Sequence, residues 1–273
     1  MAHGSGLTAQ GGLDMRPASA VGRAARLELR FCERDGRTVM AGAYAEPPFR
    51  VGRTFPEGNG VHMIMAWSAP GIFGGDAFEQ VIRVEAGARV RLTSQSALQV
   101  HPSSEGGVAT LRSRYIVDEG GELSCFWDPL IPFAHSRLDQ RCEIELAPGA
   151  RLSWSDAFMA GREARGERWQ FASLAHELRV VRGGRLDYLE RFTITEPRDQ
   201  PWVGGRASYF GSTIVSHPAA TAAAAEAAHR RLVGLTDAVA ACDLIARELL
   251  LVRLMSPSGP AFHAARGVSL GGA

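Results

Sequence analysis

One pattern constrains the fold of this chain more than any other: a run of alternating apolar and polar residues meets a glycine and then resumes. The pattern recurs around Gly87, Gly121, Gly149 and Gly184, and around Gly149 it spans residues 142–154. A period of two residues is typical of strands that bury one face. We therefore expect each glycine to reverse the chain between two paired strands, as in a hairpin.

The spacing of these glycines suggests an internal repeat. They are 34, 28 and 35 residues apart, within the range of stacked or solenoid-like repeats but too irregular for a propeller or a strict β-helix. A weaker copy of the pattern surrounds Gly36. A lone hairpin buries too little apolar surface to be stable, so neighbouring units must pack on one another. The predicted fold class is mainly β, with stacked hairpins forming a coiled sandwich or a distorted β-solenoid and a few helices near the C-terminus.

The two ends of the chain differ from this β-rich middle. Residues 1–25 are predicted to be a disordered leader, because they are rich in Gly, Ser and Ala and lack the apolar segment of a secretory signal. Residues 26–273 are expected to form a single β-rich domain, with a helix-containing C-terminal part from about residue 216. Within that part, Ala219–Leu232 has high helix propensity.

Composition argues against several classes of function. All 30 basic residues of this 273-residue chain are arginine, and the net charge is +1. Without lysine there is no Schiff-base nucleophile, no pyridoxal-phosphate anchor and no lysine of a phosphate-binding loop. The arginines are not grouped with aromatic residues, so no nucleic-acid partner is expected. No apolar run approaches the ~20 residues of a membrane helix, so we expect a cytoplasmic protein without a membrane partner.

Motifs for metal or nucleophilic chemistry are also missing. Cys32, Cys125, Cys142 and Cys242 lie far apart and are expected to be small buried hydrophobes. The segment His62–Met65 brings a nitrogen and soft sulfurs together, which could suit a transition metal, but packing of a strand in the core is favoured. There is no Gly-x-Ser-x-Gly elbow. We therefore expect a protein that is not an enzyme and holds no tightly bound cofactor.

Five blocks of sequence in one order carry a resemblance to a known family. They are Pro70–Asp76, Leu92–Ala97, Pro129–Arg137, Gly149–Trp154 and Gly161–Glu167. This succession resembles the urease accessory protein D family, called UreD or UreH, from about Arg26 to about Met255.

The resemblance implies a non-enzymatic chaperone that helps to incorporate nickel into apo-urease. The implied partners are apo-urease, a helical urease accessory protein and an accessory GTPase, with Ni(II) bound only in transit. The absence of a phosphate-binding loop agrees with a GTPase activity that belongs to a partner. The family fold is mostly β and suggests strands at Leu249–Leu254. Local spacing instead favours a helix over Thr236–Met255, and we follow the family.

Asp76 is the first candidate site residue. It ends the turn Gly74-Gly75-Asp76, in which glycine supplies positive φ angles and the aspartate can bond the nearby backbone. The alternative is metal transit: Asp76 would line an internal passage, because a hard carboxylate holds a hydrated divalent ion loosely. Both hypotheses remain open at this stage.

The second candidate site is the loop Gly161–Glu167, which contains Arg162, Glu163, Arg165 and Glu167. Such a charge density usually indicates an exposed loop. Arginine also forms bidentate contacts with carboxylates and is enriched where proteins dock. These four residues are therefore candidates for partner binding, or for ordering a neighbouring strand.

The sequence departs from the family pattern at two places. Ala97–His101 replaces a segment that often reads Ala-Thr-Lys-Val-Tyr, so His101 is either an ordinary exposed residue, which we favour, or an added nickel ligand. After Arg266 the terminal helix is expected to be shortened or replaced. Two other functions remain as alternatives, a β-solenoid module that binds a protein or glycan and a metal-dependent hydrolase.

Overall fold

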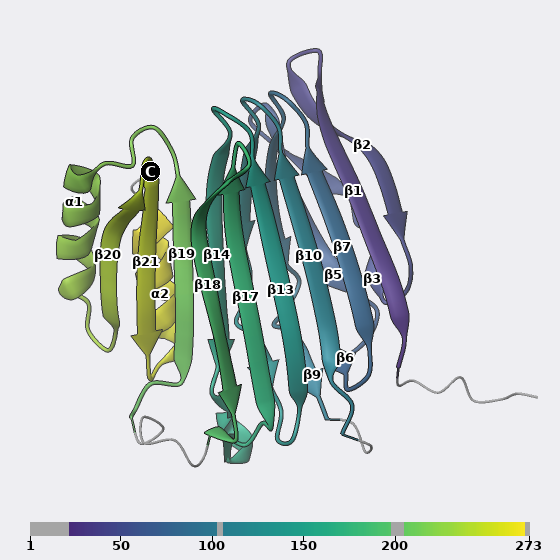
Figure 1. Ribbon diagram of the computed structural model, residues 1–273, viewed down its shortest axis with the longest axis vertical. Helices are drawn as coiled ribbons and strands as arrows, with labels where there is room; N and C mark the ends of the chain where they lie inside the picture. The colour runs from purple at the N-terminus through teal and green to yellow at the C-terminus, as the bar shows by residue number, and fades with distance from the viewer. Residues whose placement is uncertain (1–21, 103–105, 198–204, 271–273) are drawn as a thin grey trace, which may run out of the picture.

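The computed structural model describes residues 22–102, 106–197 and 205–270. Two large sheets lie face to face and coil along one axis around a shared apolar core, with two helices at one end (Figure 1). The predicted fold class, a mainly β coiled sandwich or distorted β-solenoid, is confirmed. Most of the predicted leader, residues 1–21, lies outside the described residues, and the first strand already begins at Ala24.

Among the described residues, one sheet has seven strands in the order β18-β17-β13-β10-β7-β1-β2. Their bounds are β1 (Ala24–Arg34), β2 (Arg37–Ala45), β7 (Ala77–Val84), β10 (Ala109–Val117), β13 (Arg137–Leu146), β17 (Ser173–Arg182) and β18 (Arg185–Thr195).

The facing sheet has nine described strands in the order β20-β21-β19-β14-β11-β8-β5-β3, with β4 paired to β5. Their bounds are β3 (Phe49–Arg50), β4 (Thr54–Glu57), β5 (Gly60–Trp67), β8 (Arg89–Ser94), β11 (Glu122–Phe126), β14 (Arg151–Met159), β19 (Tyr209–Ser216), β20 (Val239–Ala246) and β21 (Leu249–Ser256).

Short elements line one edge of the coil. A small sheet contains β6 (Ile72–Phe73), β9 (Gln99–His101) and β12 (Ile131–Pro132), which come from successive coils and pair in parallel. A second pair contains β15 (Gly161–Arg162) and β16 (Glu167–Arg168) around a 3₁₀ turn at Glu163–Arg165. The helices are α1 (Ala222–Val233) and α2 (Gly259–Leu270). No helix in the described ranges is both long and apolar enough to cross a membrane.

The hairpin interpretation is wrong at Gly87, Gly121 and Gly149. Each of these glycines lies in an arch that joins a strand of the seven-stranded sheet to a strand of the nine-stranded sheet, so the two strands do not pair. The strands pair instead in parallel with the next coil, as β7 does with β10 and β8 with β11. Gly36 and Gly184 do lie in hairpins. An arch and a hairpin bury the same alternate residues, so the sequence pattern is identical for both.

Parallel stacking sets the inward residues of successive coils into rows. Ile82, Tyr115, Ile144 and Val180 are neighbours across four strands and are all buried. Tyr115 packs edge to face on Trp154 of the opposite sheet, with 4.9 Å between the ring centroids. Since the rows repeat with the coil, a polar residue at an inward position lies beside inward residues of the neighbouring coils.

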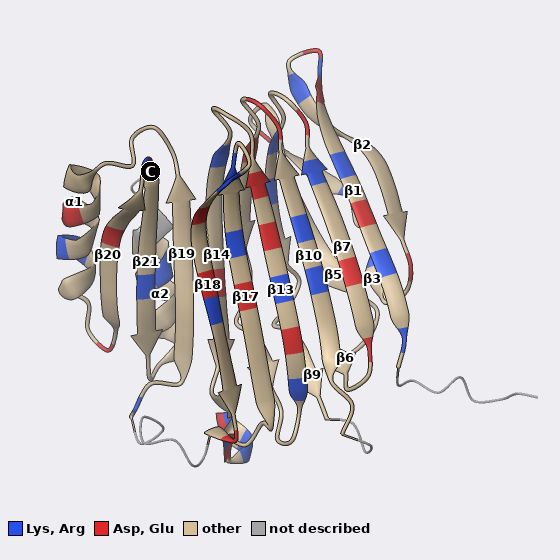
Figure 2. Ribbon diagram, viewed as in Figure 1, with Lys and Arg blue, Asp and Glu red and all other residues tan. Residues whose placement is uncertain are grey.

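The outer face of the seven-stranded sheet alternates arginine with aspartate and glutamate (Figure 2). Arg112 pairs with Asp139 across neighbouring strands at 2.7 Å, and Arg83 pairs with Asp118 at 2.9 Å. Such cross-strand pairs stabilise a sheet modestly and neutralise its charge. The arginines of this face are therefore part of a mixed-charge surface rather than a basic patch.

The C-terminal part contains the predicted helix and the strands that the family resemblance implied. Helix α1 begins three residues later than expected from Ala219, because the Thr221 side chain caps it by accepting from Ala224 N. The segment Thr236–Met255 contains the hairpin β20–β21 and not a helix. Pairing with β19 overrides the local helical spacing.

A helix does occupy the segment from Gly259, so replacement of the terminal helix is wrong, and its shortening relative to the family stays a prediction. Arg266 fastens this helix, α2, to the outer face of the nine-stranded sheet. Its fully buried guanidinium donates to Ser155 Oγ at 3.0 Å and to Trp127 O at 2.8 Å, and lies 4.0 Å from the Phe126 ring centroid. Burial lowers the pKa of Arg266 to about 10.

Candidate functional site

Two adjoining cavities, of about 530 and 130 Å³, lie between the sheets. Leu130, Gln140, Asp156 and Ala157 line both of them. The larger cavity lies where the seven-stranded sheet ends at β18, whereas the facing sheet continues through β19, β21 and β20 (Figure 1). The two cavities adjoin along the core toward this edge, and together they are called the passage below. Most of the lining side chains are apolar, and polar side chains interrupt them.

Polar side chains at inward positions line the passage from both sheets. In the nine-stranded sheet, Asp156, Ser212 and Arg253 are neighbours in register on β14, β19 and β21. In the seven-stranded sheet, Gln140 and His176 are neighbours on β13 and β17, with Gln140 Nε2 and His176 Nδ1 2.7 Å apart. The strand register thus places two polar rows on the facing walls of the passage.

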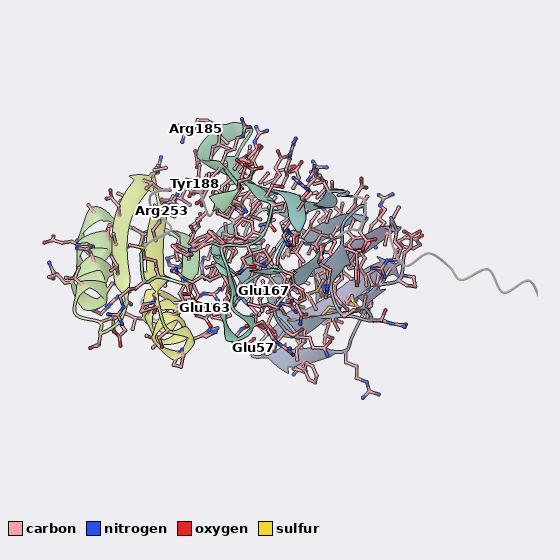
Figure 3. All side chains as sticks on the ribbon, turned by 90° about the horizontal axis from the view of Figure 1, so that it is seen from below. Glu57, Glu163, Glu167, Arg185, Tyr188 and Arg253 are labelled. Atoms are coloured by element: carbon pink, nitrogen blue, oxygen red, sulfur yellow. The ribbon has the colours of Figure 1, made fainter. Side chains whose placement is uncertain are left out.

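Glu190 on β18 joins the two rows. Its carboxylate accepts from Arg253 Nη1 at 2.7 Å, from Tyr188 Oη at 2.8 Å and from Ser212 Oγ at 3.2 Å. Figure 3 shows Tyr188 and Arg253 together at this boundary, and Arg253 Nη2 also donates to Tyr188 Oη at 3.0 Å. Glu190 is 8% exposed, so this buried charge is balanced by a guanidinium and two hydroxyl groups.

The surroundings of Asp156 act in opposite directions on the charge of its carboxylate. Its side chain retains some accessible surface because it faces the cavity, yet it is enclosed between the two sheets. Burial raises the pKa of Asp156 above its ordinary value, the charge of Glu190 adds to this rise, and His176 opposes it. A divalent cation beside Asp156 would offset that penalty.

The smaller cavity is lined by neutral polar groups as well as by Asp128, Arg141 and Asp156. Gln80 Nε2 donates to Ser113 Oγ at 2.7 Å and to Tyr115 Oη at 3.0 Å. Burial raises the pKa values of the Cys125 and Cys142 thiols well above their ordinary range, which keeps both thiols protonated at neutral pH. The prediction that the cysteines are small buried hydrophobes is confirmed for Cys125 and Cys242, whereas Cys32 and Cys142 are only partly buried, and all four are free thiols.

Asp76 lies outside this passage, in the turn before β7, and is fully buried. Its Oδ2 accepts from Phe73 N at 3.0 Å and from Arg23 Nη2 at 2.8 Å, and its Oδ1 accepts from Arg23 N at 2.9 Å. Gly75 has the positive φ angle (93°) that the turn hypothesis requires. Metal transit through Asp76 stays a prediction, and such a role would require the carboxylate to exchange its bonds with Arg23.

The loop Gly161–Glu167 contains two separate ion pairs. Arg162 and Glu167 pair with each other across β15 and β16, whereas Glu163 pairs with Arg168 at 3.1 Å. Arg165 is exposed at the turn. Glu167 also accepts from Ala134 N at 3.1 Å, which ties the loop to the segment after β12. The loop therefore orders neighbouring backbone, and its role in partner binding stays a prediction.

A row of rings and guanidinium groups connects the two predicted sites. Along the small sheet, His101 stacks on Phe73 with 4.5 Å between centroids and meets the Phe133 ring at 4.4 Å. Arg23 lies 5.7 Å from the Phe73 centroid, and Arg162 lies 3.7 Å from that of Phe133. The expectation that His101 is an ordinary exposed residue is wrong, because it is half-buried in this row, and desolvation lowers its pKa.

No group of three or more His, Cys, Asp or Glu side chains gathers as a metal centre in the described part of the chain. Met63 and Met65 are buried in the core, as favoured for the segment His62–Met65. His62 lies 2.8 Å from Thr93 Oγ1.

The passage residues were not found from the sequence, although a signal for them exists. Along most of β13, β17 and β18, every second residue is apolar except one, which is Gln140, His176 or Glu190. In β17, for example, the inward residues are Leu174, His176, Leu178 and Val180. A polar residue at an inward position must be paired or must face a cavity. That rule identifies these positions from the sequence, but it does not predict which of the side chains lie close to one another in the fold.

The fold and the passage define a class of protein: a two-sheet β-solenoid whose core contains a cavity lined in part by polar side chains, with helices packed at one end. The model of the UreD urease accessory protein family matches residues 23–267. The chain belongs to this family.

Individual relatives agree with the family model. The chain is 36% identical over 173 residues to "Urease accessory protein UreD" of Sorangium cellulosum, a match that covers 63% of this chain and 55% of that protein. It is 32% identical over 195 residues to the protein of the same name from Deinococcus radiodurans, covering 70% of each chain. A match to the Cupriavidus pinatubonensis protein, 30% identical over 241 residues, covers 85% of this chain and 82% of that protein.

Proposed function

We propose that this chain acts in the maturation of urease, as a scaffold without catalytic turnover that helps to deliver Ni(II) to apo-urease. Its partners would be apo-urease, a helical accessory protein and an accessory GTPase, and it would work in the cytoplasm. Family membership supports the role in urease maturation. The nickel route and the partners are the proposed part.

The single observation that carries the route is the passage between the sheets. Asp156 supplies hard carboxylate oxygens and His176 supplies an imidazole nitrogen, which are donors that Ni(II) accepts. Glu190 would add a second carboxylate by exchanging its bond with Arg253. The charge of Asp156 is disfavoured by burial, so a passing cation would be attracted to it. Donors spread along a cavity, rather than gathered at one point, suit movement of an ion better than storage.

The test is nickel delivery by variants that keep the shape of the passage. Asp156→Asn and Glu190→Gln remove a charge without changing side-chain size, and Glu145→Gln does the same in an ion pair on the outer face of the seven-stranded sheet. Each variant is co-expressed with urease and its accessory proteins. Purified urease is then assayed for nickel content and activity.

We expect the passage variants to lower the nickel content of urease by about tenfold, in the range seen when supporting groups of metal sites are changed, and Glu145→Gln to leave it unchanged. Co-purification of each variant with the helical accessory protein separates loss of delivery from loss of assembly. Normal nickel content with both passage variants would exclude the route while leaving the scaffold role open.

A further inference from the structure

The seven-stranded sheet has an open edge at β18. This strand of 11 residues pairs with β17 on one side and with no described strand on the other. Long unpaired edges expose backbone N–H and C=O groups that can pair with another strand, and proteins usually cover or shorten them. The edge at β18 is therefore a candidate for pairing with a segment of another molecule.

Opposite this edge, part of the inner face of the nine-stranded sheet is uncovered. Strands β19, β21 and β20 continue past β18, and their outer face is covered by α1 and α2. On their inner face Val239 is 64% exposed and Met255 is 40% exposed. Both residues line the larger cavity together with Phe192 and Ile194 of β18. An apolar strip thus lies at the position that a further strand of the seven-stranded sheet would cover.

In three ion pairs around the edge of β18, the arginine side chain is exposed and its carboxylate partner is largely buried. The side chain of Arg185 is 74% exposed and that of its partner Asp187 is 2% exposed. For Arg191 and Glu177 the values are 64% and 14%. A third pair repeats the pattern, since Arg253 is 54% exposed and Glu190 is 8% exposed. The edge therefore presents guanidinium groups to a partner, while the carboxylates that balance them lie beneath.

We propose that the edge of β18 binds an extended segment of a partner protein as an additional strand, with apolar residues toward the cavity and acidic residues toward solvent. The main chain of the segment would pair with β18, and its alternate side chains would point to opposite faces. Inward side chains would cover Val239 and Met255. Outward carboxylates would lie beside Arg185 and Arg191.

A second copy of this chain fits the edge poorly. Pairing β18 with β18 of another copy would bring two rims of exposed arginine together, and like charges across an interface cost affinity. An acidic segment has the complementary charge. This inference does not depend on nickel, because it concerns only the backbone edge, the apolar strip and the arginine rim.

The test uses a displayed library of peptides of about ten residues, the usual length of a long strand, in which apolar positions alternate with Asp or Glu. A second library carries Arg at the acidic positions. The purified chain should enrich the acidic library only. With an enriched peptide bound, hydrogen exchange should slow at the amides of Arg185–Thr195.

Matched variants decide whether binding occurs at this edge. Val239→Asp and Arg191→Glu should weaken binding of the enriched peptide by about tenfold or more. Val233→Asp changes an equally exposed valine, 62%, at the end of α1, and Arg30→Glu changes an arginine of the same sheet on β1, 56% exposed. These two controls should bind as the unchanged chain does.

Three results would overturn the proposal. One is no enrichment of acidic over basic peptides, and another is equal weakening by the control variants. The third is a concentration-dependent dimer that Val239→Asp abolishes in sedimentation, which would assign the edge to a second copy.

Discussion

Arg253 of β21 and Glu190 of β18 join the facing sheets by a charge-assisted hydrogen bond, with 2.7 Å between Nη1 and Oε1. The bond lies where the seven-stranded sheet ends, and no backbone hydrogen bond joins these two strands within the described sheets. The pair therefore holds the open end of the sandwich together and sets the width of the passage mouth.

Arg253→Met should lower the free energy of unfolding by roughly 1–3 kcal/mol, because Glu190 stays buried without its guanidinium partner. The partial exposure of Arg253 keeps the effect at the lower end of the range for buried pairs. Urea denaturation measures it. Arg30→Met, in the exposed pair with Glu85, should cost less than about 1 kcal/mol. Equal losses for the two variants would contradict a special role of the pair at the sheet boundary.

Asp156→Asn should stabilise the folded protein at neutral pH by ~1 kcal/mol, because it removes a buried charge without removing volume. Burial raises the pKa of Asp156 above 3.8, so the folded state binds this proton more tightly than the unfolded chain does. Its contribution to stability is therefore greatest below pH 3.8 and falls as pH rises through the folded-state pKa. The free energy of unfolding of the unchanged protein minus that of the variant, measured from pH 3 upward, should show this fall, because the other carboxyl groups contribute equally to both proteins. A variant less stable than the parent at neutral pH would contradict the argument.

Gly211→Ala should loosen α2 from the sheet. An added Cβ would lie 2.7 Å from Phe262 Cζ and 3.0 Å from Asp156 O, so we expect a loss of about 1–3 kcal/mol. Gly267→Ala on the exposed side of α2 meets no atom within 4 Å and should instead gain up to about 1 kcal/mol from helix propensity. Thermal unfolding of the two variants should shift in opposite directions, and a shift in one direction for both would refute this packing of α2.

Asp76→Ala should lower the free energy of unfolding by about 2–3 kcal/mol, because Phe73 N loses its acceptor and Arg23 loses its partner. Asp118→Ala, at the exposed pair with Arg83, is the control and should cost less than about 1 kcal/mol. A folded Asp76→Ala protein also tests metal transit. If it assembles and activates urease at the full rate, Asp76 acts only in the turn.

Arg162 and Arg165 distinguish the two roles considered for the loop. Arg162→Ala should lower the midpoint of thermal unfolding slightly, since it removes the pair with Glu167 and the contact with Phe133. Arg165→Ala should leave stability unchanged, because the side chain is exposed. If the loop docks on a partner, Arg165→Ala will weaken co-purification with the helical accessory protein. Normal assembly of both folded variants would leave the loop with a structural role alone.

The C-terminal part shows how local pattern and tertiary structure can disagree. Helix α1 follows from a run of alanine after a capping threonine, and both are local features. The hairpin β20–β21 contradicts the local spacing, because Leu250, Val252 and Leu254 find apolar neighbours under the helices only when the segment is extended. The family resemblance predicted this correctly where periodicity alone did not.

The sequence by itself determined most of the strands in the repeated middle of the chain and which of their faces are buried, because side-chain alternation is a local property of the backbone. It also placed the glycine turns, and for Asp76 it indicated a turn role while leaving metal transit open. Only the tertiary structure decided that Gly87, Gly121 and Gly149 connect opposite sheets, since arches and hairpins bury the same residues. It alone brought Asp156, His176, Glu190 and Arg253 around one cavity. These side chains come from four strands between residues 151 and 256. They meet only because the strands of successive coils pair in one register. The packing of the core sets that register through contacts between residues far apart in the sequence, which no local pattern contains.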